Sequence, residues 1–357
     1  MVRSLLTLAL LGTRALLGGA AATEVETRTI DEIYQAALAE GGVVTLFQGG
    51  DEPSQANALK ANFEKRFPGM TLNVTVDLSK YHDGSIDEQI AANNVYVDSA
   101  ILQTLHDFPR WASEGALLDY APLGHDQILP EFKNNETAAY YGLFIISWVG
   151  QWHTGKLPNG TAPVEWEDWV SPQLKDKLVL TYPNDDDAVL FAFNLILKQH
   201  GTAWFDRLLA LNPRWVRGTQ TPSTVYKKNG TEWAATFTSS GSLNPASPFR
   251  SSFPAKGRFV SWPQTGGILK DAPHPEGAKL LHSYILSTEF QNVRGGWSVR
   301  RDVAPPPNFP PILEMPGTDP TAFGKWMSDR AAVERLRFYF EDRLGTAQGP
   351  SPLVDDL

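Results

Sequence analysis

Apolar and polar positions along the chain alternate between a strand-like and a helix-like period. An apolar run at 43–47 leads into a glycine turn, Gln48 to Asp51, and an amphipathic stretch at 54–67 follows it. The pattern then predicts a strand at 70–76, a helix at 85–94 and a strand at 97–102. This order is typical of an open, mostly parallel α/β sheet. The first turn aims a helix N-terminus and backbone N–H groups at one point, where a small polar ligand can be held.

A second series of the same kind follows a long apolar segment at 141–149. Thr29 and Glu32 form a predicted capping box for an earlier helix that ends at Gly41. The remaining predicted elements are strands at 178–182, 214–217, 233–238, 258–262 and 267–270, helices at 107–115, 186–199, 201–211, 222–228 and 275–287, and a final helix at 321–344. We expect this last helix to pack on the first lobe, after an extended proline-rich linker at 304–311.

Chain length favours two cores over one. The chain has 357 residues, of which 42% are apolar, and single cores rarely grow this large. We predict a first lobe from 23–140 and 263–357, a second lobe from 141–262, and a hinge with a ligand cleft between them.

Charge and cysteine content narrow the function further. The net charge is −9 without a Lys/Arg run, which argues against nucleic acid and anionic membranes as partners. The absence of cysteine excludes thiolate metal sites, cysteine nucleophiles and redox pairs. The motifs H-E-x-x-H, G-x-S-x-G and G-x-x-x-x-G-K-[ST] are also missing from the sequence. We therefore expect no enzyme and no cofactor.

The N-terminus is typical of a secretory signal peptide at 1–22. Arg3 precedes an apolar region from Leu5 to Leu11, and small residues, Ala20 to Ala22, form a cleavage site. N-x-T sequons are potential glycosylation acceptors in a eukaryotic secretory pathway, and they lie at Asn73, Asn135, Asn159 and Asn229. The sequence thus predicts a secreted, extracellular protein, or a periplasmic one if the source is bacterial.

Several blocks, taken in order, resemble a known family. They are VVTLFQGGDEPSQANALKANFEKRFPGMTLNV at 43–74, DFPRWASEGALLDYAP at 107–122, VEWEDWVSPQLKDKLVLTYPNDDDA at 164–188, APHPEGAKLLHSYILSTEFQ at 272–291 and WSVRRDVAPP at 297–306. The order is similar to that of the periplasmic-binding-protein type II fold, within the extracellular solute-binding family that includes ferric-iron binders of ABC importers. The sequons suggest a secreted eukaryotic, fungal-like homologue. The resemblance implies a two-lobe α/β fold that captures a small polar solute by hinge closure.

The resemblance also implies ligand contacts at strand-end loops that face the cleft. We take the candidate ligand-binding residues to be Gln48, Gly49, Gly50, Asp51, Ser79, Tyr81, His82, Gln103, Thr104, Trp148, Asn184, Asp185, Ser239 and Ser240. The iron binders of this family carry an adjacent tyrosine pair just after the strand that ends near Phe237, where this chain has Thr238, Ser239 and Ser240. Phenolate oxygens select ferric iron, so we predict no metal site.

Ordinary structural roles compete with these assignments. The glycines at 49 and 50 also suit a plain strand-to-helix turn, and the aspartates at 185–187 also suit a helix N-terminus. Trp148 and Trp152 could stack on a flat ligand or pack in a core, and Tyr81, His82 and Asp83 form a loop that could hold a metal.

Three functions are compatible with these sequence features. The first is a monomeric secreted binder of a small polar solute, which would pass its cargo to a membrane permease if the source is bacterial. The second is an interaction protein with a degenerate cleft. The third is a hydrolase or isomerase that uses Asp51, His82 or Asp185 as acid or base.

Overall fold

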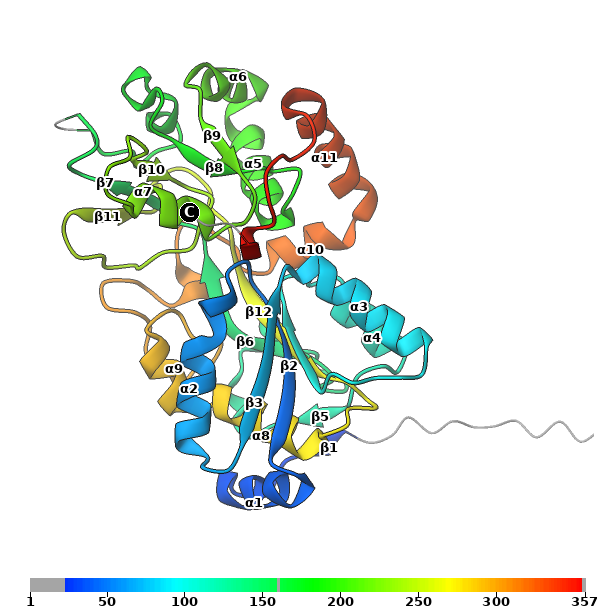
Figure 1. Ribbon diagram of the computed structural model, residues 1–357. Helices are drawn as coiled ribbons and strands as arrows, with labels where there is room; N and C mark the ends of the chain where they lie inside the picture. The colour runs from blue at the N-terminus through cyan, green and yellow to red at the C-terminus, as the bar shows by residue number, and fades with distance from the viewer. Residues whose placement is uncertain (1–22, 159–160, 355–357) are drawn as a thin grey trace, which may run out of the picture.

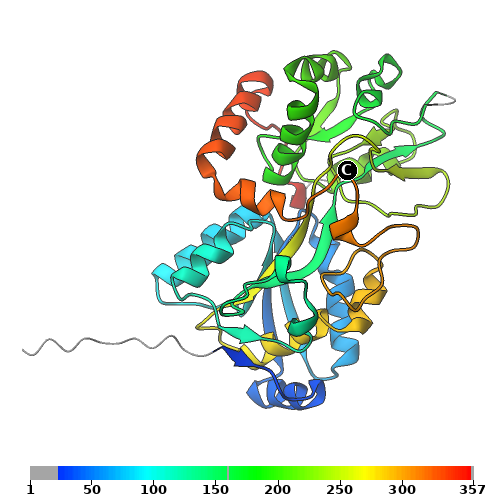
Figure 2. The ribbon, with the colours of Figure 1, turned by 180° about the vertical axis from the view of Figure 1, so that it is seen from behind.

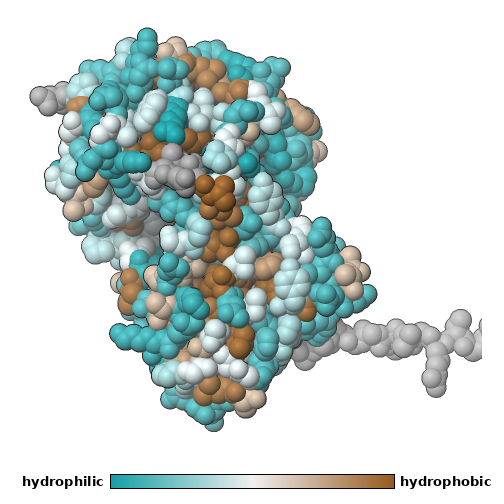
Figure 3. Space-filling model, viewed as in Figure 1, coloured by the Kyte–Doolittle hydropathy of each residue, from teal (hydrophilic) through white to brown (hydrophobic). Residues whose placement is uncertain are grey.

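The computed structural model describes residues 23–158 and 161–354 of the chain. They form two lobes, one above the other, joined by a narrow waist (Figures 1 and 3). The predicted signal peptide at 1–22 and the sequon asparagine Asn159 lie outside the described residues.

The first lobe is built on a five-stranded sheet. Its strand order is β3-β2-β4-β12-β6, with bounds β2 Val43–Gly49, β3 Thr71–Asp77, β4 Ser99–Leu102, β6 Tyr141–Ser147 and β12 Ser261–Ile268. β2 pairs in parallel with both β3 and β4, whereas β12 is antiparallel to β4 and β6. The carboxyl ends of the three parallel strands therefore meet at one edge, which faces the second lobe (Figure 1).

Helices cover both faces of this sheet. One apolar core lies under α1 Ile30–Glu40, α2 Asn57–Arg66, α8 Pro275–Ile285 and α9 Thr288–Arg294, and a smaller core lies under α3 Ser79–Ala91 and α4 Asp107–Ser113. The alternation predicted for residues 43–102 is confirmed. One boundary is wrong, because α3 begins at Ser79 and not at residue 85, so the expected loop at Ser79 to Gly84 forms the first turns of the helix.

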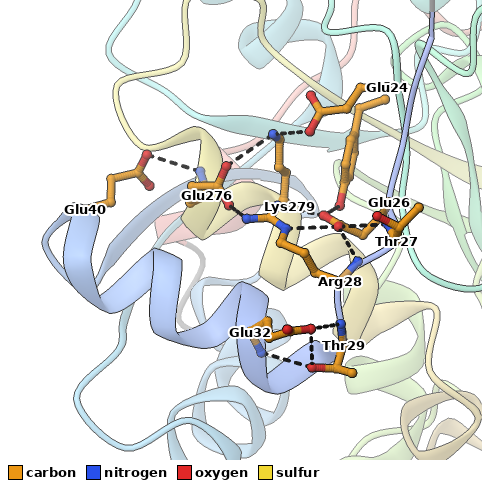
Figure 4. Close-up of polar contacts among 10 residues, drawn as sticks. Glu24, Glu26, Thr27, Arg28, Thr29, Glu32, Glu40, Glu276 and Lys279 are labelled. Carbon is orange, nitrogen blue, oxygen red and sulfur yellow. Dashed lines mark hydrogen bonds and ion pairs between the residues drawn. The ribbon is translucent and has the colours of Figure 1, made fainter.

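A network of charged groups ties the start of the described chain to α8 (Figure 4). β1 Glu24–Val25 pairs with β5 Tyr120–Ala121, and Arg28 donates to both Glu26 and Glu276 at 2.7 Å. Burial raises the pKa of Glu26, but hydrogen bonds from Arg28 and Tyr120 outweigh it and lower that pKa to about 2. The predicted capping box of Thr29 and Glu32 is present at the N-terminus of α1.

The second lobe holds two small sheets and a large aromatic core. The first sheet has the order β10-β7-β11 and the second pairs β8 with β9. A single parallel bridge between Leu178 and Ala235 joins the two sheets. The bounds are β7 Gly150–His153, β8 Val179–Thr181, β9 Arg214–Val216, β10 Ala235–Thr236, β11 Phe249–Ser252, α5 Asp187–His200, α6 Thr202–Ala210 and α7 Thr221–Lys227.

The C-terminal helices pack on the second lobe, whereas the sequence pattern had led us to expect packing on the first. Instead of one helix there are two, α10 Ala322–Ser328 and α11 Arg330–Leu344, separated at Asp329, which caps α11. The ring of Phe340 lies 5.4 Å from that of Phe193 and 5.0 Å from that of Phe205, both in the second lobe. The predicted apolar helical face is present, but periodicity does not reveal which core that face covers.

Two strands run through the waist and act as the connection between the lobes (Figures 1 and 2). β6 leaves the first sheet and leads through Trp148 into β7, and β12 enters the first sheet from the second lobe. Trp148 N donates to Val260 O at 3.1 Å where they cross. Residues 141–147 pair inside the first sheet, so the chain enters the second lobe later than the predicted residue 141. The two strands expected at 258–262 and 267–270 form one strand, β12. None of the helices described is long and apolar enough to cross a membrane.

Candidate ligand-binding cleft

A cavity, called here the central cavity, lies at the seam between the lobes. The first lobe lines it with the loops that follow β2, β3 and β4, and the second lobe with three separate loops. The waist strands close its back wall. The lining residues are Gly49, Gly50, Asp51, Gln55, Leu78, Ser79, Gln103, Ile146, Trp148, Asp186, Thr219, Ser240, Trp262 and Gln264.

The glycine turn after β2 is shaped by its neighbours. A β-carbon at Gly49 would collide with the hydroxyl of Ser79, and one at Gly50 would collide with the side-chain oxygen of Gln55. The same Gln55 oxygen accepts from Asp51 N at 2.6 Å, and Ser79 Oγ accepts from Gln103 N at 2.9 Å. The glycines thus let three loops pack tightly together, which fixes the floor of the central cavity.

Asp51 links the two lobes directly. Its Oδ2 accepts from Thr219 N and, at 2.8 Å, from Gln220 N, both at the start of α7 in the second lobe. The side chain is only 2% exposed. Burial raises the pKa of this carboxyl, against the opposing effect of the two backbone donors. Its second oxygen, Oδ1, is buried without a hydrogen-bond partner among the described residues.

Further polar contacts join the lobes around Asp51. Thr224 Oγ1 donates to Glu52 Oε1 at 2.9 Å. Lys80 Nζ, on α3, donates to Asp185 Oδ1 at 2.8 Å, and Arg217 donates to Tyr81 Oη at 3.2 Å. These contacts connect the two lobes across the seam, so the molecule is in a closed arrangement.

Asp186 contributes a second carboxyl group to the central cavity. Its Oδ1 caps α5 by accepting from Ala188 N and Val189 N at 2.8 and 2.9 Å. Burial raises the pKa of Asp186 to about 7, and Asp187 and Asp185 add to this effect. The group therefore titrates near neutral pH.

Two indole rings form the apolar wall of the central cavity. Trp148 and Trp262 meet edge to face at 5.1 Å, and they come from the two strands that cross the waist. Both are almost fully buried, and the Nε1 of Trp148 has no hydrogen-bond partner in the described part of the chain.

A neighbouring cavity, the side cavity, is lined mainly by charged groups. Asp185 is paired with Lys80 and Arg217 at 2.8 and 3.0 Å. Asp187 is paired with Arg330 and Arg337 at 2.9 and 2.6 Å. Most of the charges around the side cavity are therefore already neutralised by the protein.

The structure brings together about half of the residues selected from the sequence. Gly49, Gly50, Asp51, Ser79, Gln103, Trp148 and Ser240 line the central cavity, while Thr104 and Asp185 line the side cavity. Tyr81 is 48% exposed and accepts from Arg217 at the rim.

The other selected residues lie outside both cavities. His82 is buried against Phe47, with ring centroids 4.3 Å apart, and its Nε2 lies 3.1 Å from Thr75 O. It points inward because it belongs to α3 and not to a loop. Asn184 donates to Gly345 O at 3.0 Å, the Gln48 amide donates to Gly49 O, and Ser239 is buried, donating its hydroxyl to Ser240 O.

Several lining residues were not selected from the sequence. Gln55 carried a signal, since it stands three residues after Glu52 at the start of a helix, in the capping-box spacing that the structure contains. Asp186 fell within the aspartate run at 185–187. No sequence pattern indicated the other lining residues Thr219, Trp262 and Gln264, because only the fold places them beside residues more than a hundred positions away.

No cluster of three or more His, Asp or Glu side chains suited to a metal ion is found in the part of the chain that the structure describes. At the position where the resembling iron binders carry tyrosines, Thr238 and Ser239 are buried and Ser240 lines the central cavity.

Comparison with solved structures identifies the architecture. No protein-family model and no curated protein sequence matches the chain. The substrate-binding protein of an ABC transporter from Agrobacterium tumefaciens is similar over 85% of this chain and 94% of its own, with a TM-score of 0.68 and 16% identity. The chain has the two-lobe fold of the periplasmic binding proteins. At this level of identity the comparison establishes the fold alone.

Two further proteins with this periplasmic-binding fold carry named ligands. AfuA from Actinobacillus pleuropneumoniae, with fructose-6-phosphate bound, matches 86% of this chain and 100% of its own, with a TM-score of 0.66 and 20% identity. Iron-bound HitA from Pseudomonas aeruginosa matches 84% and 99%, with a TM-score of 0.64 and 16% identity. Proteins with this fold thus hold ligands as different as a sugar phosphate and a metal ion.

Proposed function

We propose that this protein captures a small polar solute in the central cavity by closure of its two lobes, without catalysis. The observation that carries the proposal is the construction of the cavity, whose walls come from both lobes and from the waist strands. A ligand there touches both lobes only when they are closed, so it shifts the population toward the closed form.

The contacts across the seam support closure as the response to cargo. The side chains that join the lobes beside the cavity include Asp51, Glu52 and Lys80. Hydrogen bonds of this kind contribute only about 0.5 to 3 kcal/mol each. We infer that a bound solute supplies the additional free energy that keeps the lobes together.

The catalytic alternative receives no support from its proposed residues. His82 lies in the core of the first lobe, where burial lowers its pKa, and Asp185 is neutralised by Lys80 and Arg217. Asp51 is engaged in the contact between the lobes. Neither His82 nor Asp185 is therefore placed to exchange protons with a bound solute in the way that general acid–base catalysis requires.

We also propose that the protein acts outside the cell. Three sequon asparagines, Asn73, Asn135 and Asn229, have exposed side chains, as a glycan acceptor requires. A fungal-like secreted homologue would bind its solute without an importer, and a bacterial one would deliver it to a membrane permease. We expect the protein to be a monomer.

Calorimetry and thermal unfolding against a panel of polyols, amines, phosphate and phosphonate esters, thiamine-like cofactors and metal ions test the proposal. We expect at least one micromolar binder, which adds about 2.7 kcal/mol to the free energy of unfolding at a hundredfold excess over its Kd. A protein that responds to no compound would contradict solute capture and favour an interaction protein with an empty cleft.

A further inference from the structure

The carboxyl groups of the central cavity have no cationic partner in the described part of the chain. Neither Asp51 nor Asp186 takes part in any of the ion pairs found there, and the lining contains no lysine or arginine. A buried carboxylate without a counter-charge is costly, unless a ligand supplies that charge. The central cavity therefore has a deficit of positive charge.

The side cavity shows that this deficit is local. Lysine and arginine are abundant a few residues away, but Asp185 and Asp187 hold them in ion pairs of 2.6 to 3.0 Å. Within the described residues, the chain thus pairs one set of carboxylates and leaves Asp51 and Asp186 without an ion pair, although Asp186 also borders the side cavity and is near enough to Lys80 for that cation to act on its pKa.

Two buried atoms indicate what the ligand must offer. Among the described residues, Asp51 Oδ1 is an acceptor without a donor, and Trp148 Nε1 is a donor without an acceptor. Their residues are 2% and 4% exposed, and both line the central cavity. A ligand that satisfies both atoms carries an N–H or O–H group at one end and an oxygen acceptor at the other.

The indole wall favours a cation as well. Trp148 and Trp262 line the same cavity as the two carboxyl groups. Indole is the side chain that attracts cations most strongly through its ring face. Carboxylates and indoles together are a suitable environment for an organic ammonium group, whereas a phosphate or carboxylate would meet two acidic groups and no counter-charge.

We propose that the solute captured in the central cavity is a small organic ammonium compound that carries a hydroxyl or carbonyl oxygen. Its ammonium group lies between Asp51 and Asp186, and its oxygen accepts from Trp148 Nε1. This inference rests on the proposed function, because it names the chemical class of the same cargo.

Matched sets of compounds test the inference. The full-length secreted protein is titrated by calorimetry with glucosamine, glucose and glucose 6-phosphate, and with ethanolamine, ethylene glycol and glycolate. We expect an ammonium member to bind at least about tenfold more tightly than its neutral and anionic counterparts. Tighter binding of a neutral or anionic member overturns the ammonium assignment and leaves solute capture intact. Binding of no member also overturns the assignment, and the broader panel decides separately whether any solute is captured.

Two variants then test the residues. Asp186→Asn keeps an oxygen that can cap α5. Asp51→Asn keeps an oxygen that accepts from Thr219 N and Gln220 N, while its NH₂ group replaces the unpartnered Oδ1. Each is expected to weaken ammonium binding at least about tenfold, and circular dichroism in the absence of ligand checks that each variant is folded. Asp31→Asn, on α1 with a side chain 78% exposed, is the control. Unchanged affinity in both folded variants would overturn the assignment.

Discussion

At the scale of single residues, the two oxygens of Asp51 have different surroundings. Oδ2 accepts from backbone N–H groups of the opposite lobe, while Oδ1 is buried at the central cavity without a partner among the described residues. One carboxyl group thus joins the contact between the lobes to the ligand contact that we propose. A residue with both roles makes closure sensitive to whether the cavity is filled.

Replacement of Asp51 by alanine should shift the unliganded molecule further toward its open form. It removes both hydrogen bonds to α7, and bonds to a charged acceptor contribute about 1.5 to 3 kcal/mol each. We expect the radius of gyration from small-angle X-ray scattering to increase in Asp51→Ala and to stay unchanged in Asp31→Ala. Equal radii for wild type and Asp51→Ala would show that this carboxyl does not hold the lobes together.

Asp186 should give the protein a distinctive dependence on pH. Its pKa in the folded state, about 7, lies above its ordinary value, so its contribution to stability is complete at acidic pH below that ordinary value. The contribution is lost as the pH rises through about 7. Groups that act on it are Asp185, Asp187 and Lys80, and others that line the neighbouring cavity are Asp83, His106, Arg330 and Arg337.

The difference in unfolding free energy between wild type and Asp186→Asn isolates this group, because the variant keeps the cap of α5 but does not titrate. Relative to the variant, wild type should lose stability between about pH 4 and pH 7, by at most about 4 kcal/mol. Urea denaturation at several pH values measures this difference. A constant difference over that range would mean that Asp186 is ionised with an ordinary pKa.

At the scale of elements, the segment that follows α11 reaches the seam between the lobes. Gly345, directly after α11, accepts from Asn184 through its carbonyl, and the chain continues to a short turn at Pro352–Val354 (Figure 1). Pro352 is buried, and its Cβ lies 2.6 Å from the position that a β-carbon on Gly218 would take. Gly218 also borders Asp51, so the C-terminal segment covers the outer side of the contact between the lobes.

Removal of residues 349–357 should make ligand release faster. Burial of an apolar side chain such as that of Pro352 contributes about 1 to 2 kcal/mol, which corresponds to roughly tenfold in the dissociation rate constant. Stopped-flow displacement of any ligand found with the panel measures this rate. Removal of residues 355–357 alone is the matched control, and equal rates in both truncations would assign the segment no part in closure.

Sequence periodicity predicted most elements because their apolar faces are local features. The strands at 43–49 and 71–77 and the helix at 187–200 all follow from such patterns. The strand-end loops after β2, β3 and β4 were selected through the family resemblance, and they converge in the structure because parallel strands end at one edge. The start of α3 was missed because Ser79 to Gly84 are polar and contain a glycine, both of which are typical of loops.

Contacts between distant parts of the chain account for the remaining errors. Asp51 meets Thr219, just before α7, across 168 positions, and α11 covers a core formed by α5 and α6. Neither pairing leaves a pattern in the local sequence. The sequence shows three adjacent aspartates at 185–187 but does not indicate which of them lines the central cavity. Only the structure shows that Asp186 does so and that burial raises its pKa.

At the scale of the whole molecule, two separately packed lobes are joined by two strands and by the return of the chain through the proline-rich segment. Each lobe has its own apolar core, and the cavity lies where the strand-end loops of both meet. Such a construction can open without breaking either core. The solute capture that we propose therefore depends on movement of the lobes in response to cargo.

The most direct test of that movement is a distance between spin labels on the two lobes. The chain has no cysteine, so Glu88→Cys on α3 and Lys198→Cys on α5, both exposed, give one defined pair of labels. Without ligand we expect a broad distance distribution, and with the panel compound that most raises the melting temperature we expect a single shorter distance. One distribution that no binding compound changes would contradict capture by closure of the lobes.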